Sequence, residues 1–246
     1  MPFTLSHAAI VLPLKKLNPA WFSMTGLIFG SMSPDLEYFT RMKILATHGH
    51  DWVGAIYFNI PLALAYCFVF HLFVRKILID HLPNFIKNRF IHLRLFDWMK
   101  YFKANGLVVI LSILIGTYTH LLWDAFTHEW GFFAKKINFI NEVWMTIGFE
   151  LKGFKVLQYT SSIIGLLFII FWIYRMPKQK LNSSRFIISF WVIVMLLTML
   201  ISFIRFYFFP IEMISGNIIV VPMMAGFLSL IILGILNQYL IKKPQD

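Results

Sequence analysis

Three groups that can bind a metal ion end one of the most apolar stretches of this sequence. Residues 116–131 read GTYTHLLWDAFTHEWG, in which His120, Asp124 and His128 follow one another at intervals of four. Residues four apart project from one face of a helix, so His120 and Asp124 can offer a nitrogen and a carboxylate oxygen to one divalent ion such as zinc. The HxxxD spacing is also common by chance, and the alternative is a helix that leaves a membrane and meets water.

The composition is typical of a membrane protein. Of the 246 residues, 59% are hydrophobic and 13% are charged, whereas a soluble domain carries about 25% charged residues. Five stretches approach the roughly 20 apolar residues that cross a bilayer as a helix. They lie near residues 52–74, 105–123, 157–174, 186–208 and 217–240. Because long apolar segments must satisfy their backbone polar groups internally, the predicted fold is an all-α, polytopic helical bundle.

Two shorter helical segments are expected before the first span. Residues 4–14 are predicted to form a helix with Thr4 as its N-cap and His7 in its first turn. Residues 20–33 are apolar but short for a crossing. The sequence Ser33-Pro34-Asp35 is typical of a helix start, with a cap, a proline at the first helical position and an acid at the positive end of the dipole.

The positive charge does not indicate nucleic-acid binding. The net charge is +11, but the basic residues cluster beside the spans, and no basic stripe with interleaved stacking aromatics stands apart from them. The excess of lysine and arginine places the connector after the first span in the cytoplasm. All eight histidines precede residue 157. We therefore expect the site in residues 1–156, and a three-span anchor or scaffold in residues 157–246.

The topology would bring most candidate groups to one membrane face. If the spans at 52–74 and 105–123 are antiparallel, the start of the first and the end of the second meet the same compartment. The groups expected there are His48, His50, Asp51, His120, Asp124 and His128, together with Asp35, Glu37 and, if residues 20–33 do not cross, His7.

Several of these groups also have a structural explanation. Asp35 and Glu37 could stabilise the positive end of a helix dipole. His7 could be a polar residue in an amphipathic turn, and the two loop histidines could be hydrated. His120 is harder to explain in this way, because ionisable groups within spans usually face the bundle interior and have a function.

Four stretches together resemble a known family. They are PFTLSHAA at residues 2–9, GSMSPDLEYF at 30–39, THGHDWVG at 47–54 and the 116–131 stretch. The pattern resembles a bacterial family of uncharacterised multi-span membrane proteins with PFTxSH, GSxxPD and HxxxDxxT motifs. That family is similar in turn to the YdjM-like metal-dependent hydrolases of the inner membrane, and distantly to the zinc-dependent phospholipase C and single-strand nuclease superfamily.

Carried over by position, the resemblance implies a set of metal ligands. They are His7, Asp35, His50, His120 and Asp124. One or two divalent ions are implied, with zinc the expected metal. His48 and His128 are reserve ligands, and the hydroxyl of Thr127 would orient a ligand.

The implied chemistry is metal-assisted hydrolysis, in which the ion polarises a phosphoryl or acyl oxygen and activates water. Glu37 and Asp51 are the catalytic candidates, and Asp35 is an alternative general base. Asp51 stands where the family more often has a small hydroxyl residue. It is therefore a further ligand, a supporting carboxylate or a residue without a role.

These inferences predict a membrane-bound hydrolase of the bacterial inner membrane. Its site would face the extracytoplasmic side and act on a lipid or phosphodiester, with membrane lipid and not nucleic acid as partner. A transporter component is disfavoured, because the later spans carry almost no ionisable group beyond Arg205 and Glu212. A non-catalytic structural membrane protein is the third possibility.

Overall fold

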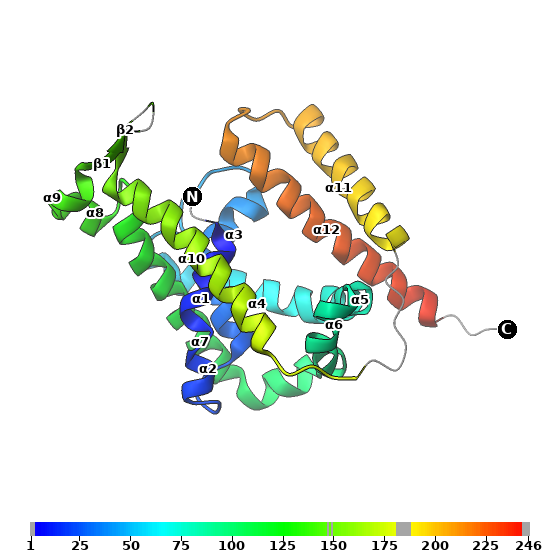
Figure 1. Cartoon of the computed structure of the whole chain (residues 1–246). Coiled ribbons are helices and arrows are strands. Elements are labelled where there is room, and N and C mark those ends of the chain that lie inside the picture. Colours follow the sequence, from blue (N-terminus) through cyan, green and yellow to red (C-terminus); the bar gives the residue numbers. More distant parts are fainter. Residues whose placement is uncertain (1–2, 147, 149, 181–187, 243–246) are drawn as a thin grey trace. The chain divides into compact units, whose positions relative to one another are not determined.

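The computed structural model describes residues 3–146, 148, 150–180 and 188–242, and the side chains of these as far as residue 239. Figure 1 shows helices joined by short connectors, with one small β-hairpin. In chain order the elements are η1 (Thr4–His7), α1 (Ala8–Val11), α2 (Leu14–Leu17), α3 (Met24–Arg41), η2 (Ala55–Asn59), α4 (Ile60–Val69), η3 (Phe70–Val74), α5 (Arg75–His81), α6 (Asn84–Phe90), η4 (Ile91–Leu95), α7 (Trp98–Thr127), α8 (Phe132–Lys136), α9 (Asn138–Asn141), β1 (Val143–Thr146), β2 (Glu150–Lys152), α10 (Gly153–Arg175), α11 (Ile188–Phe208) and α12 (Ser215–Lys242).

Among the described residues, five helical segments are long and apolar enough to cross a membrane, which confirms the predicted all-α, five-span fold. They are Ala55–His81, Trp98–Lys136, Gly153–Arg175, Ile188–Phe208 and Ser215–Tyr239. The segment Trp98–Lys136 extends beyond the predicted span at residues 105–123 at both ends. Large apolar side chains such as Ile164 and Met199 lie exposed on these helices, as a lipid-facing surface requires.

The chain divides into two compact units. The first unit comprises Met1–Leu36, Ala46–Leu64 and Asn105–Tyr174, and the second comprises Glu37–Leu45, Ala65–Ala104 and Arg175–Asp246. Helix α10 belongs to the first unit, so the units do not follow the boundary expected at residue 156. The boundary at residue 156 divides the chain by function, with the site before it and the anchor after it, and this division stays a prediction.

The second unit has a core formed by α5, α11 and α12. Ile77 of α5 packs with Phe190 and Val194 of α11, and Leu230 and Leu233 of α12 pack against them. Figure 1 shows α11 (yellow) running alongside α12 (orange).

The predicted helix over residues 4–14 is broken into shorter pieces. A 3-10 turn, η1, leads into α1, and α2 then begins after Pro13, its N-cap residue. The prediction that Thr4 caps this helix is wrong, because Phe3 occupies the N-cap position and makes no capping bond through its side chain. The Thr4 hydroxyl instead donates to Asp35, 31 residues away.

The predicted helix start at Ser33-Pro34-Asp35 is also wrong, because α3 is continuous and contains Pro34 in its interior. A proline cannot donate to the carbonyl four residues before it. The carbonyl of Gly30 instead accepts the hydroxyl of Ser33, with 2.8 Å between Oγ and O. This replacement of the lost donor is how prolines are tolerated inside buried helices, and it places Asp35 in mid-helix, away from any helix dipole end.

Helices α3 and α7 approach each other closely through glycines. A Cβ added to Gly116 of α7 would lie 2.5 Å from the carbonyl oxygen of Leu27, and one added to Gly26 of α3 would lie 2.6 Å from that of Val109. A hydrogen bond of 2.8 Å between the hydroxyls of Ser33 and Thr117 crosses the same interface. Small residues therefore set the distance between the two helices that carry Asp35, His120 and Asp124.

We expect Gly116→Ala to destabilise the protein by about 1–3 kcal/mol, because the new methyl group must push backbone atoms apart. The matched control is Gly226→Ala in α12, where the added Cβ meets only Thr198 Oγ1 at 3.7 Å. The control should unfold at the wild-type temperature or above, since alanine favours a helix. Thermal unfolding followed by tryptophan fluorescence in detergent measures both, and equal midpoints would contradict the close approach.

Candidate metal centre

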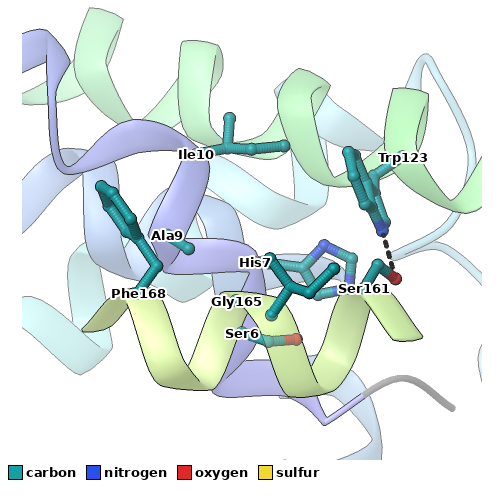
Figure 2. A pocket seen from close by; sticks show the side chains of 9 residues that line it. Ser6, His7, Ala9, Ile10, Trp123, Ser161, Gly165 and Phe168 are labelled. Carbon is teal, nitrogen blue, oxygen red and sulfur yellow. Dashed lines mark hydrogen bonds between the residues drawn. The ribbon is translucent and has the colours of Figure 1, made fainter. Parts of the chain in front are cut away.

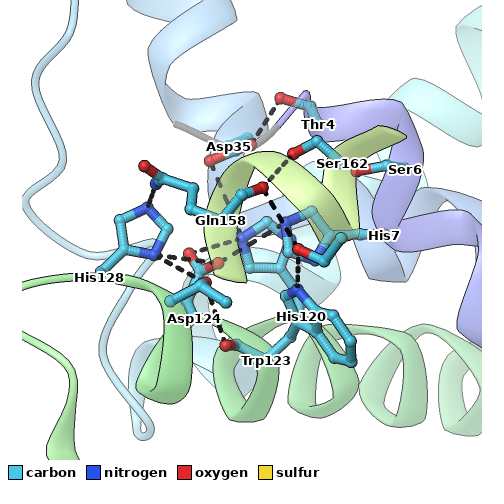
Figure 3. Close-up of polar contacts among 12 residues, drawn as sticks. Thr4, Ser6, His7, Asp35, His120, Trp123, Asp124, His128, Gln158 and Ser162 are labelled. Carbon is cyan, nitrogen blue, oxygen red and sulfur yellow. Dashed lines mark hydrogen bonds and ion pairs between the residues drawn. The ribbon is translucent and has the colours of Figure 1, made fainter. Parts of the chain in front are cut away.

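Histidines and aspartates of the first unit form two overlapping groups that share His120. Asp35 comes from α3, His50 from the loop before the first span, and His120 and Asp124 from α7. The ligand atoms of Asp35, His50 and His120 all lie within 4.8 Å of one another. The sequence therefore brings distant segments together at a group that could hold a metal ion, as Figure 3 shows in part.

Four separations between these side chains match those of neighbouring ligands on one tetrahedral ion, although Asp124 is grouped with His7 and His120 and not with Asp35 and His50. With ligand atoms about 2.0–2.2 Å from zinc, neighbouring ligand atoms lie about 3.3–3.6 Å apart. The four separations are 3.4 Å from His50 Nε2 to Asp35 Oδ1, 3.6 Å from His50 Nε2 to Asp124 Oδ2, 3.2 Å from His120 Nε2 to Asp124 Oδ2, and 3.8 Å from His120 Nε2 to Asp35 Oδ1. All four are close to an edge of such a tetrahedron.

His7 adds a further donor beside this group. Its ring stacks on that of His120 with 3.8 Å between centroids, and its Nε2 lies 3.6 Å from Asp124 Oδ1. His7, His120 and Asp124 form a second group whose ligand atoms lie within 4.8 Å of one another. Both oxygens of Asp124 thus face imidazoles, Oδ2 toward His120 and Oδ1 toward His7.

Several buried atoms that could bind a metal ion lack hydrogen-bond partners among the described residues. Within the part of the chain that the structure describes, neither His7 Nε2 nor His120 Nε2 makes a hydrogen bond, although His7 is 5% exposed and His120 is 1% exposed. The Oδ1 atom of Asp124 makes no hydrogen bond either, although His128 Nδ1 lies 3.3 Å from it. Buried polar atoms are almost always satisfied, so their orphaned state is what a cation between them would explain.

Neighbouring groups fix the orientation of two candidate ligands. The Nδ1 atom of His120 lies 2.7 Å from the carbonyl oxygen of Ser31. A carbonyl only accepts, so Nδ1 carries the proton and Nε2 presents its lone pair to the cluster. The Thr4 hydroxyl donates to Asp35 Oδ2 over 2.5 Å, which leaves Oδ1 facing His50 and His120.

A series of hydrogen bonds from α10 orients His128 beside Asp124. The Gln158 Oε1 accepts from Lys155 Nζ at 3.0 Å, so its amide nitrogen donates to His128 Nε2, also at 3.0 Å. His128 therefore carries its proton on Nδ1, which lies 3.3 Å from Asp124 Oδ1. This tautomer makes His128 a positioning residue for Asp124 (Figure 3).

Burial and neighbouring charges shift the pKa values of the cluster. Burial lowers the pKa of His7 to about 3, and His120 acts in the same direction, so His7 is neutral. Burial also lowers the pKa of His50, but its contacts with Asp124 and Asp35 outweigh this and raise it to about 9. Burial raises the pKa of Asp35, whereas His120 and His50 outweigh it and hold that pKa below its usual value. A proton on His50 thus balances part of the negative charge, and a bound cation would displace it, because ligands bind deprotonated.

The groupings that could hold an ion include neither His48 nor Asp51, and Thr127 Oγ1 lies 3.4 Å from His128 Nδ1. His48 is exposed and its Nδ1 lies 2.9 Å from the Tyr57 hydroxyl. Asp51 is exposed, and its Oδ2 accepts from the backbone nitrogen of Gly54. The hydroxyl of Thr127 donates to the carbonyl of Trp123.

Glu37 is buried and paired with Arg41, with 2.8 Å between Glu37 Oε1 and Arg41 Nη2. Residues two apart on a helix point to nearly opposite sides, so Glu37 faces away from Asp35. The groupings that could hold an ion do not include it. Its proposed catalytic role stays a prediction without geometric support.

Sequence reasoning missed two residues of the cluster. Thr4 was interpreted as a cap, although its hydroxyl serves Asp35. Gln158 was assigned to the scaffold, although it is 1% exposed and supports His128. Gln158 is the one amide in the predicted span 157–174, and this was a usable signal, because polar groups within spans usually face the bundle interior.

A cavity of about 270 Å³ adjoins the cluster through His7. It is lined by Ser6, His7, Ala9, Ile10, Trp123, Ser161, Ile164, Gly165 and Phe168. Most of these side chains are apolar, and the indole of Trp123 donates to the hydroxyl of Ser161 (Figure 2). The imidazole of His7 therefore borders both the orphaned oxygen of Asp124 and an apolar space.

Comparison with protein-family models matches residues 1–240 to one family, described as a domain of unknown function, DUF4184. The chain belongs to this family. No curated protein and no solved structure matches it. The match confirms the predicted membership of an uncharacterised family and covers every candidate ligand. The similarity to YdjM-like hydrolases stays a prediction.

We expect the purified protein to retain a divalent metal ion that His120→Ala and Asp35→Ala variants lose, because each variant removes a donor from the proposed tetrahedron. The matched control is His92→Ala, which removes an exposed histidine. Elemental analysis of protein purified without chelators measures all four. Equal metal content in wild type and both site variants would contradict the centre.

We expect Thr4→Val to weaken metal affinity by about 10–100-fold while the fold persists, because the hydroxyl orients Asp35. The control is Thr160→Val on α10, whose hydroxyl only bonds within its own helix. Competition against a chelating dye gives both dissociation constants. An unchanged constant in Thr4→Val would show that Asp35 needs no such support.

Proposed function

We propose that this protein is a membrane-bound, metal-dependent hydrolase. The observation that carries the proposal is the cluster of orphaned imidazole and carboxylate atoms beside an apolar cavity. Perturbed, buried ionisable groups that face a cavity are the usual mark of an active site. The spans support an integral membrane location, and the bias of basic residues favours the extracytoplasmic face of a bacterial inner membrane for the site.

The geometry favours two neighbouring ion positions that share Asp124. His50, His120, Asp35 Oδ1 and Asp124 Oδ2 would hold one ion in a closed set of four ligands. His120 has a single lone pair available and serves only this position. His7 Nε2 and Asp124 Oδ1 would hold a second ion with few protein ligands, and catalytic sites differ from structural ones in keeping such open positions.

Divalent ions bound in this way, with zinc the expected metal, would polarise a phosphoryl or acyl oxygen and lower the pKa of bound water toward neutrality. The residues of the chain supply the positioning. Asp124, positioned by His128, would contribute one oxygen to each ion position. The Thr4 hydroxyl would orient Asp35, and the Ser31 carbonyl would orient His120. His7, neutral and at the edge of the cavity, would bind on the side from which the substrate enters.

A lipid or another phosphodiester is the substrate class that we favour. The cavity beside His7 includes Ile164, a residue on a helix long and apolar enough to span a membrane. An apolar group of the substrate could therefore lie next to the ion position. The resemblance to phospholipase C-like proteins supports the same class by analogy.

A structural ion is the rival function, and the closed set of four ligands favours it. Such an ion would tie α3, the loop before the first span and α7 together without any reaction. Structural metal sites are closed and contribute directly to folding. The rival predicts a single ion per chain, no hydrolysis, and a large loss of thermal stability on chelation.

We expect the wild-type protein to bind two ions and to hydrolyse bis(p-nitrophenyl) phosphate. His7→Ala should keep about one ion and lose hydrolysis by roughly 100-fold or more, because it opens the second position. Elemental analysis and release of p-nitrophenol measure the two properties on the same sample. The control is His48→Ala, since His48 contacts Tyr57 rather than the cluster. One ion, no hydrolysis and collapse on chelation would establish the structural ion instead.

A further inference from the structure

A buried arginine in the second unit has two nitrogens whose N–H groups find no acceptor among the described residues. Arg75 of α5 is 8% exposed, and its Nε and Nη1 make no hydrogen bond within the part of the chain that the structure describes. Trp98, the first residue of α7, is 2% exposed, and its indole nitrogen likewise has no partner among the described residues. Burying an unpaired cation is far more costly than burying a paired one.

A series of ring contacts connects these two side chains. The ring of His71, one helical turn before Arg75, stacks on Trp98 with 4.4 Å between centroids and 8° between planes. The guanidinium carbon of Arg75 lies 5.4 Å from the centre of the Phe96 ring. The ring centroids of Phe96 and His71 are 5.5 Å apart, so Arg75, His71, Phe96 and Trp98 form one cluster.

The nearby acids are engaged elsewhere. Asp80 forms an ion pair with Arg94, with 2.5 Å and 3.1 Å between the two pairs of atoms. Asp97 is exposed and accepts the backbone nitrogen of Lys100 at 3.0 Å. Between the described residues, no ion pair joins Arg75 to either acid. Asp97 is close enough to interact electrostatically with Arg75, but it accepts neither the Nε–H nor the Nη1–H of Arg75. The cluster therefore offers a positive charge and N–H donors that no carboxylate among the described residues accepts.

The position of the cluster at the ends of two spans indicates which kind of anion could bind there. Arg75 lies near the end of the span Ala55–His81, and Trp98 begins the span Trp98–Lys136. Span ends meet the headgroup layer of a bilayer, where tryptophan is enriched and basic pockets bind anionic headgroups. Arginine is also the residue most used to bind phosphate oxygens.

We propose that Arg75 and Trp98 form a binding site for a phosphate oxyanion, supplied by the headgroup of an anionic membrane lipid. Arg75 supplies the charge and Nε–H and Nη1–H donors, and Trp98 supplies its indole N–H. The rings of His71 and Phe96 wall the site and exclude water, which strengthens each of these bonds. The site is independent of the metal centre, since its residues belong to the second unit and the ligands to the first.

The test measures lipid binding to the full chain in neutral detergent. Phosphatidylglycerol is titrated and followed by native mass spectrometry, and inorganic phosphate is tested in parallel by its effect on the unfolding temperature. Arg75→Met should weaken phosphatidylglycerol binding at this site by about tenfold or more, the usual effect of losing hydrogen bonds to a charged group. The matched control is Lys76→Met, which removes the same charge from the adjacent exposed position and should change binding less than about twofold.

A second variant separates the loss of the binding site from a loss of the fold. Trp98→Phe keeps an aromatic ring for His71 to stack on and removes only the indole donor, so it should fold and still weaken phosphatidylglycerol binding. If inorganic phosphate raises the unfolding temperature of the wild type but not that of Arg75→Met, the site is supported. Free phosphate is then a second source of the oxyanion. Equal phosphatidylglycerol binding by wild type, Arg75→Met and Trp98→Phe would overturn the proposal.

Discussion

The cost of removing two carboxylates from water is the constraint on which the first unit depends. Asp35 and Asp124 are each at most 2% exposed, and an isolated buried carboxylate would take up a proton rather than remain charged. They are surrounded instead by the imidazoles of His50 and His120, with a hydroxyl and a histidine relay behind them. The arrangement keeps both acids ionised inside an apolar helical unit, and ionised carboxylates are what a divalent cation needs.

The same constraint explains why α3 and α7 are so close. The carboxylate of one helix can reach the imidazole of the other only if the two backbones nearly touch. Gly26 and Gly116 allow this approach, and the carbonyl of Ser31 then lies within 2.7 Å of His120. Pro34 is accommodated in the same stretch because Ser33 replaces its missing donor. The packing motif and the polar site are therefore one structure, and a change in the first displaces the second.

The sequence predicted the parts of this structure that depend on local patterns. Long apolar runs predicted five spans, and the spacing of His120 and Asp124 predicted a shared helix face. The continuity of α3 could not be predicted, because Ser33-Pro34-Asp35 satisfies the rules for a helix start and only the contact of Ser33 with Gly30 shows otherwise. Supporting residues such as Thr4 were equally hidden, because their partners lie far away in the sequence. Local chemistry identifies candidate ligands, whereas tertiary contacts decide which of them are oriented.

The two units carry opposite imbalances of hydrogen-bonding groups. In the first unit, Nε2 of His7, Nε2 of His120 and Oδ1 of Asp124 make no hydrogen bond among the described residues, and a cation would satisfy them. In the second unit, the Nε–H and Nη1–H of Arg75 and the indole N–H of Trp98 lack acceptors among the described residues, and an anion would satisfy them. Neither imbalance could be relieved by small movements of the side chains alone, because the rings are stacked and the helices are packed. A polar group left unsatisfied by the chain in an apolar environment is costly, so each imbalance specifies the charge of what binds there.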